Sequence, residues 1–233
     1  MSRTRINTVG LLLCALGLSL SASTRAQQTS GKRSEVWPEV DVFVPLNRKF
    51  RLLFIASVNQ ERETKNATEG KVGVHLDYLW KDALSFRVGY RYIFSLDNSD
   101  PFKEHRIVIE QTYHRSLGHQ FTLHDRNREE LRWVDGDFSA RYRNRLMVEY
   151  ETKIFRHPLI PYASAEAYYD SRFNTFNRTR YQAGLQIPLR QRDLWLLFPR
   201  HQRVVEIYYS RQLDTRSEPR HLNAFGITFT WHF

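Results

Sequence analysis

Apolar and polar residues alternate with a period of two along most of the chain. In residues 84–94 the apolar side chains occupy even positions, from Leu84 to Phe94, whereas Arg87 and Arg91 occupy odd ones. A period of two places successive side chains on opposite faces of a β-strand. The pattern therefore predicts strands with one apolar face and one charged face.

The alternation recurs in eleven segments of the chain, and none of them shows a capped pattern of helical period. The segments are 36–44, 50–59, 71–80, 84–94, 104–114, 120–132, 138–151, 161–170, 177–188, 203–212 and 222–233. We therefore expect an all-β protein.

Two β architectures fit strands with one apolar face. A soluble sandwich buries that face, whereas a membrane barrel turns it to lipid and its polar face inward. Most of the segments are about 10–13 residues long; a tilted strand needs ~9–11 residues to cross a bilayer, and soluble strands average ~5–6. Aromatic residues such as Trp80, Tyr150 and Trp231 lie near segment ends, as in interfacial girdles. We therefore predict a transmembrane antiparallel β-barrel over residues 35–233.

The strand number follows from chain length and pairing rules. Bacterial single-chain barrels have even strand numbers, so we predict about twelve strands, with ten as the next alternative. Either a further strand lies within Leu189–Gln202, or the segment near Trp37 lies outside the wall. Short connections near 45–49, 81–83 and 115–119 are expected in the periplasm. Longer polar connections near 60–70, 95–103, 171–176 and 213–221 are expected outside the cell.

The N-terminal residues Met1–Ala26 have the features of a secretory signal. A basic start precedes the apolar run Val9–Leu20, which is too short to span a bilayer, and small residues at Thr24 and Ala26 suit a signal peptidase. We predict cleavage after Ala26 and a tail at 27–34. The chain's one Cys, Cys14, lies in this segment, so no disulfide is expected after cleavage.

Hydropathy and the export signal argue against two classes of protein. The mean hydropathy of −0.56 excludes a bundle of membrane helices. The formal net charge of +10 is compatible with nucleic-acid binding. The export signal argues against a nucleic-acid partner, and the arginines have a barrel interior to occupy.

The last residues resemble the insertion signal of bacterial outer-membrane barrels. The chain ends on Phe233, and aromatic side chains stand at the second and fourth positions before it, Trp231 and Phe229. The resemblance implies that the barrel-assembly machinery and outer-membrane lipid are the partners of this chain. It also places the mature protein in the bacterial outer membrane.

The body of the chain resembles an outer-membrane barrel family catalogued as domain of unknown function 2490. The resembling stretches are 104–111 (EHRIVIEQ), 125–132 (DRNREELR), 141–146 (RYRNRL), 161–166 (PYASAE) and 177–184 (NRTRYQAG). The resemblance covers most of residues 35–233. It implies an outer-membrane barrel and transfers no activity, cofactor or site residue.

The polar faces of the predicted strands carry many charges, which we expect to line the lumen. An Arg facing lipid at the midplane costs ~2–4 kcal/mol, so these groups belong inside. The predicted lumen-lining set is Arg87, Arg91, Glu104, Arg106, Glu110, Arg126, Arg128, Glu130, Arg132, Arg141, Arg143, Arg145, Glu149, Glu166, Arg178 and Arg180.

Two functions are compatible with such a lumen. Arg–Glu ladders can fill and rigidify a barrel with a structural or passive role. Alternatively, surplus arginines can line a water-filled pore that prefers small anionic solutes. The size of the barrel decides between them, because eight strands are filled by side chains whereas larger barrels keep a lumen.

An enzyme is the third hypothesis. His114, Ser116, His119, His124 and Asp125 lie close in sequence, as in outer-membrane hydrolases, but they flank a presumed periplasmic turn. The sequence carries no GxSxG, HExxH, P-loop or CxxC motif. We therefore expect no enzyme, no metal and no cofactor.

Overall fold

The computed structural model describes residues 32–61, 67–81, 83–98, 101–155, 157–189, 202–216 and 219–233. The predicted signal peptide and most of Leu189–Gln202 lie outside the described residues. No described segment forms a helix that is long and apolar enough to cross a membrane.

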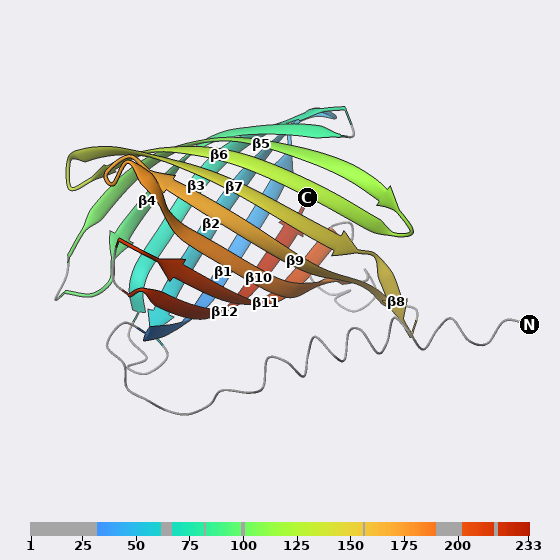
Figure 1. Cartoon of the computed structure of the whole chain (residues 1–233). Helices are drawn as coiled ribbons and strands as arrows, with labels where there is room; N and C mark the ends of the chain where they lie inside the picture. The colour runs from blue at the N-terminus through green and yellow to red at the C-terminus, as the bar shows by residue number, and fades with distance from the viewer. Residues whose placement is uncertain are drawn as a thin grey trace, which may run out of the picture. The chain divides into compact units, whose positions relative to one another are not determined.

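All regular elements of the described residues are β-strands, which confirms the all-β prediction (Figure 1). The strands are β1 (Lys32–Pro45), β2 (Phe50–Glu61), β3 (Ala67–Trp80), β4 (Leu84–Ser95), β5 (Lys103–Gly118), β6 (Phe121–Val134), β7 (Asp137–Tyr150), β8 (Thr152–Ile154), β9 (His157–Asp170), β10 (Thr175–Leu189), β11 (Gln202–Asp214) and β12 (His221–His232). β1 begins at Lys32, inside the predicted tail 27–34, because its pairing with β12 starts there.

The sheet closes on itself into a barrel. Consecutive strands of the wall pair antiparallel, β9 pairs with both β7 and β10, and β12 pairs with β1. Eleven of the twelve described strands form the wall, and the short β8 pairs only with β9 outside it. An odd number of alternating strands makes the first and the last run in the same direction, so β1 and β12 pair in parallel. The segment near Trp37 is therefore a wall strand.

The two rims of the barrel are distinguished by the chain direction. We call the rim with Phe233 and the turn 119–120 the C-terminal rim, and the opposite rim, with the turn 135–136, the N-terminal rim. Asp135 and Gly136 have φ of 51° and 98°, the left-handed conformation that a two-residue hairpin turn requires. The N-terminal rim, where long connections were expected, thus also carries a tight turn.

The wall has an apolar outer face and a charged inner face. Val88, Ile109 and Leu146 point outward and are 47–50% exposed, whereas Glu130 and Asp170 point inward and are fully buried. Outward aromatic rings contact one another at both rims: Phe121 with Tyr150 near the C-terminal rim, and Trp133 with Phe138 near the N-terminal rim. The barrel is therefore apolar outside and polar inside, the reverse of a soluble protein.

Candidate functional site

All sixteen residues of the predicted charged set occupy inward positions of the wall. The pairing register supports this placement. On β5 and β6, for example, Glu110 stands directly opposite Arg128, and Arg106 stands opposite Arg132. Thirteen of the sixteen line the larger of two cavities inside the barrel. The residues of this set lie on β4 to β7, β9 and β10, and further charged side chains such as Glu39, Lys71 and Glu206 line the cavity from β1, β3 and β11.

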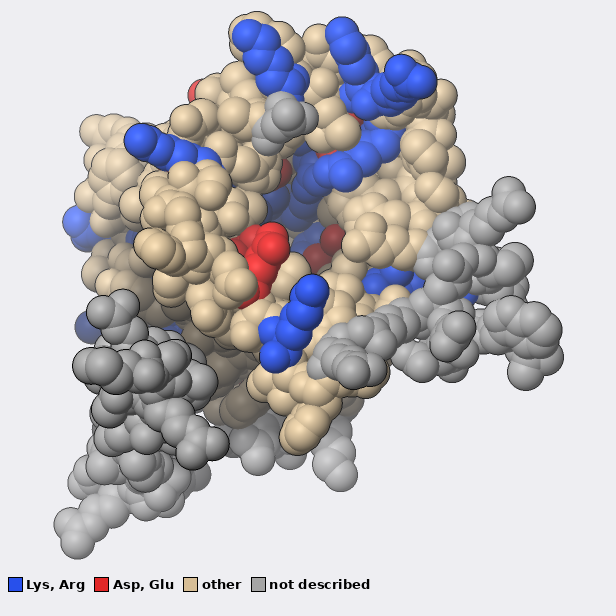
Figure 2. Space-filling view, turned by 90° about the vertical axis from the view of Figure 1, so that its right-hand side faces the viewer, with Lys and Arg blue, Asp and Glu red and all other residues tan. Residues whose placement is uncertain are grey.

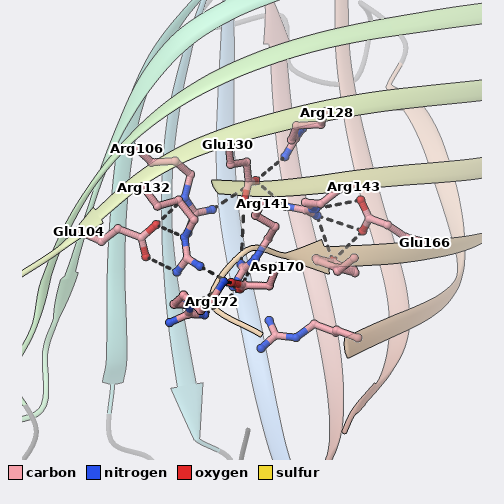
Figure 3. A network of polar contacts seen from close by, with 12 residues as sticks. Glu104, Arg106, Arg128, Glu130, Arg132, Arg141, Arg143, Glu166, Asp170 and Arg172 are labelled. Carbon is pink, nitrogen blue, oxygen red and sulfur yellow. Dashed lines mark hydrogen bonds and ion pairs between the residues drawn. The ribbon is translucent and has the colours of Figure 1, made fainter. Parts of the chain in front are cut away.

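Glu130 on β6 is the centre of this network (Figure 3). Its carboxylate is fully buried and accepts a hydrogen bond from Nη1 of Arg143 at 2.8 Å. Arg106 lies at 3.4 Å, and Arg128 and Arg141 lie at 3.9 Å. A buried carboxylate needs a paired cation to offset its desolvation, and Glu130 has four.

Arg132 joins two further carboxylates at the side of the network nearer the N-terminal rim. Its Nε and Nη2 donate to the two oxygens of Glu104 at 2.7 and 2.8 Å, and its Nη1 lies 3.5 Å from Asp170. Asp170 also accepts from Arg141 at 2.9 Å and from Arg172 at 2.8 Å. Bidentate pairs of this kind fix both partners in orientation as well as in charge.

Glu166 on β9 anchors the other side of the network. It accepts from Nε and Nη2 of Arg143 at 3.1 and 3.0 Å, and from Nη2 of Arg126 at 2.6 Å. The Tyr168 hydroxyl donates to the same carboxylate at 2.7 Å. The guanidinium of Arg143 lies 4.5 Å above the Tyr168 ring, a cation–π distance. Arg143 is thereby held on three sides.

Two more acids extend the pairing toward β3. Glu110 accepts a hydrogen bond from Nε of Arg128 at 2.6 Å. Asp77 accepts from Nε of Arg87 at 2.6 Å and from Nε of Arg51 at 2.9 Å. The ladder of pairs thus runs across the wall from β2 to β9.

The network leaves open space in the rest of the lumen. A cavity of about 680 Å³ lies beside it, lined on the opposite wall by smaller polar side chains such as Ser57, Thr228 and Thr230. A second cavity of about 390 Å³ lies nearer the C-terminal rim. Seen from the side where β8 lies in Figure 1, the barrel is hollowed, with Lys and Arg inside the hollow (Figure 2).

Three arginines, Arg87, Arg126 and Arg145, line both cavities. The two cavities therefore adjoin at these three side chains. Arg145 has no carboxylate within ion-pair distance among the described residues, and its buried Nε has no hydrogen-bond partner there. Arg145 thus presents an unpaired positive charge to the lumen, whereas Arg87 is paired with Asp77 and Arg126 with Glu166.

The histidines near the turn 119–120 do not form a hydrolase site with Asp125. His114 and His124 point inward with their Nδ1 atoms 2.7 Å apart, and His124 Nε2 lies 2.8 Å from Glu149. Asp125 is on the outer face, where it accepts from Asn144. No group of three or more His, Cys, Asp or Glu in the described parts of the chain is arranged to hold a metal ion.

Five residues of the network are absent from the predicted set: Arg51 and Asp77 on β2 and β3, and Tyr168, Asp170 and Arg172. Tyr168 and Asp170 share the even-numbered, inward face of β9 with Glu166, so the alternation could have identified them. Arg172 lies in the turn that follows, where no alternation exists. Its hydrogen bonds to Asp170 raise the pKa of the Arg172 guanidinium above its ordinary value.

The three residues of the C-terminal signal point outward on β12. Phe229 and Phe233 are 39% and 49% exposed, and Trp231 is partly exposed. The Phe233 amide donates to the Phe43 carbonyl at 3.0 Å, which ties the end of the chain to β1. The aromatic stripe therefore faces the surroundings of the barrel rather than the lumen.

Comparisons with known proteins identify a family. No curated protein matches the chain. The crystal structure of the β domain of the Bordetella autotransporter Brka aligns with 82% of this chain and 83% of its own, at a TM-score of 0.39 and 12% identity. The model of a family described as a protein of unknown function, DUF2490, matches residues 34–221. The match confirms the resemblance seen in the sequence, and the chain belongs to the DUF2490 family.

Proposed function

We propose that the mature chain is an outer-membrane β-barrel with a passive role, whose Arg/Glu network holds the wall rigid. The observation that carries this proposal is the reversed polarity of the wall. Outward side chains such as Val74, Val88 and Ile207 are 41–51% exposed, and similar residues surround the barrel. An apolar surface of that extent is unfavourable in water and favourable in lipid.

The ion-pair network supports a structural rather than a catalytic role. Glu104, Glu110, Glu130 and Glu166 are each bound by two or more arginines and are at most 7% exposed. Carboxylates held in this way are not free to act as bases or nucleophiles. They join neighbouring strands across the lumen, as a rigid barrel requires.

Cell fractionation tests the location. We expect the full chain, expressed in a Gram-negative host, to appear in the outer-membrane fraction without residues 1–26. Its mobility on gels should change on boiling, as folded barrels show. Recovery of a soluble periplasmic monomer would overturn the proposal.

A second function, a narrow conduit for small anions, is favoured by the lining of the cavities. Thirteen Lys and Arg against seven Asp and Glu line the larger cavity. Buried acids behind the lining, such as Glu110, Glu130 and Asp170, offset part of this excess, and the remaining positive charge, with the unpaired Arg145, favours anions. Arg87, Arg126 and Arg145 line both cavities, so an anion that moved from one cavity to the other would pass them. Arginine side chains that line a pore are an element of anion selectivity.

Conductance in a planar bilayer separates the two functions. A closed barrel would support the structural role, whereas a steady current with an anion-directed reversal potential in a KCl gradient would support the conduit. In the second case, Arg145→Gln should reduce the anion preference. Lys153→Gln is the control, because it removes the same charge from an exposed position on β8.

A further inference from the structure

The outer wall carries one cluster of polar side chains that the lumen does not explain. On β6, Asp125, Asn127 and Glu129 occupy three consecutive outward positions. Gln111 on β5 stands opposite Asn127, and so does Asn144 on β7. We call these five residues the polar patch.

The polar patch lies at half height on the wall. Phe121 and Trp133 mark the two aromatic rims of β6, and Asn127 is midway between them, with about 20 Å of strand on either side. In a barrel that spans a membrane, this is the depth at which polar groups are most unfavourable. The inference therefore rests on the proposed membrane location.

Hydrogen bonds inside the polar patch satisfy only part of it. Asn144 Nδ2 donates to Asp125 at 2.7 Å and to Asn127 at 3.1 Å. Gln111 and Glu129 are exposed, and no described residue hydrogen-bonds to either side chain. Two polar groups per barrel would thus be unpaired at the depth of the lipid tails.

The wall differs in relief on the two sides of the polar patch. β9 follows β7 in the sheet, and its outward positions next to the patch are Ala163, Ala165 and Ala167. On the other side, β5 projects bulky Ile109 and Tyr113, which are 47% and 44% exposed. The face therefore has a raised edge on β5 and a shallow edge on β9.

We propose that this face, from β5 to β9, binds a second copy of the chain side by side in the membrane. A two-fold axis along the membrane normal, passing near β6 and β7, would place β5 of each copy against β9 of the other. The projecting side chains of one copy then fit the alanines of its partner. Such a shape is self-complementary, as a two-fold interface requires.

The hydrogen-bonding groups of the polar patch are self-complementary as well. Gln111 brings an amide donor and an amide acceptor, Asn127 brings an amide whose nitrogen makes only a 3.5 Å contact to Asp125, and Asp125 and Glu129 bring carboxylate acceptors; the amide nitrogen of Asn144 already donates twice within its own copy. The Gln111 and Asn127 amides of one copy can therefore donate to the carboxylates of the other. Because this pairing removes the polar groups of both copies from contact with lipid, it stabilises the dimer at the depth where these groups are most unfavourable in the single barrel.

Cross-linking of single cysteines in isolated outer membranes tests the proposal. Ala165→Cys is made in full-length chain that also carries Cys14→Ser, which leaves no other Cys. The control is Val40→Cys, an outward, 37% exposed position on β1, which lies across the barrel in the strand order. With a short bis-maleimide we expect at least five-fold more dimer from Ala165→Cys than from Val40→Cys.

A second set of variants tests the role of the polar patch. Adding Asn127→Leu and Asn144→Leu should abolish that excess of dimer, whereas adding Asn223→Leu, an outward Asn of β12, should preserve it.

The alternative results are distinguishable. Heat-modifiable monomer in the outer membrane, without excess dimer from Ala165→Cys, would contradict the proposed interface and leave the proposed location intact. A cross-linked species of another size would show that a different protein covers the face and would also overturn the proposal. Failure of the unmodified chain to reach the outer membrane would contradict the proposed function itself.

Discussion

Replacing Arg143 should destabilise the barrel far more than replacing Arg145. Both arginines point inward from β7, two residues apart, so the two Ala variants remove the same side chain from neighbouring positions. Arg143 binds the buried Glu130 and Glu166, whereas Arg145 has no ion-pair partner among the described residues. The comparison therefore isolates the contribution of the ion-pair network to the free energy of unfolding.

The magnitude follows from what remains after the change. Removing one partner of a buried pair typically costs about 3–5 kcal/mol. In Arg143→Ala, Glu166 keeps Arg126 at 2.6 Å, and Glu130 keeps Arg106 at 3.4 Å. We therefore expect a loss of about 3 kcal/mol, at the lower end of that range. Arg145→Ala should cost roughly 0–1 kcal/mol, as for a hydrated charge.

Equilibrium unfolding of the refolded barrel in denaturant, followed by tryptophan fluorescence, measures both variants. The double variant Arg143→Ala with Glu166→Ala should lose less than the sum of the single changes, by about 1–3 kcal/mol, because the two residues are in direct contact. Equal losses from Arg143→Ala and Arg145→Ala, or additive losses in the double variant, would refute the assignment of Arg143 to a buried pair.

Three further changes test other parts of the account. Val74→Arg, on the outer face of β3, should cost about 2–4 kcal/mol in vesicles, whereas Gln182→Arg, which lines the larger cavity, should cost much less; unfolding in denaturant compares them. Phe233→Asn should lower the amount of folded protein in the outer membrane, and Thr228→Asn on the inner face should not; equal effects would mean that the faces of β12 are wrongly assigned. Gly226→Ala should cost about 1–3 kcal/mol, because its Cβ would lie within 2.4 Å of the Tyr208 ring, and Tyr208→Ala should remove that penalty in the double variant.

The alternation of the sequence predicted the strands and their faces well, because a period of two is a local property. Each of the eleven alternating segments corresponds to one wall strand, and Arg141 and Arg143 share the inner face with Arg145. The pairing of the first strand, β1, with the last strand, β12, is not local, because it joins the two ends of the described chain. It depends on whether the number of wall strands is odd or even. The even number expected from other bacterial barrels would make β1 and β12 antiparallel, whereas the eleven wall strands make them parallel.

The pairing partners inside the lumen were predictable only in part. Glu130 and Glu166 could be named for Arg143 because they occupy neighbouring strands. The role of Arg132 as a bridge between Glu104 and Asp170 depends on the tilt of β6 and β9 across the lumen, which no spacing reveals. The polar patch could not be predicted for a different reason. Residues 125–129 are all polar, so no alternation of apolar and polar side chains assigns their faces.

The reversed polarity of the wall is tested most directly by spin labels on β1 in lipid vesicles. Single cysteines at residues 39, 40, 41 and 42 place the nitroxide alternately toward the cavity and away from it, since Glu39 and Asp41 line the lumen and Val40 faces outward. We expect apolar oxygen to reach the labels at 40 and 42 preferentially, and a water-soluble nickel chelate to be excluded from them. Equal access of the nickel chelate to all four positions would contradict a barrel whose outer face lies in lipid.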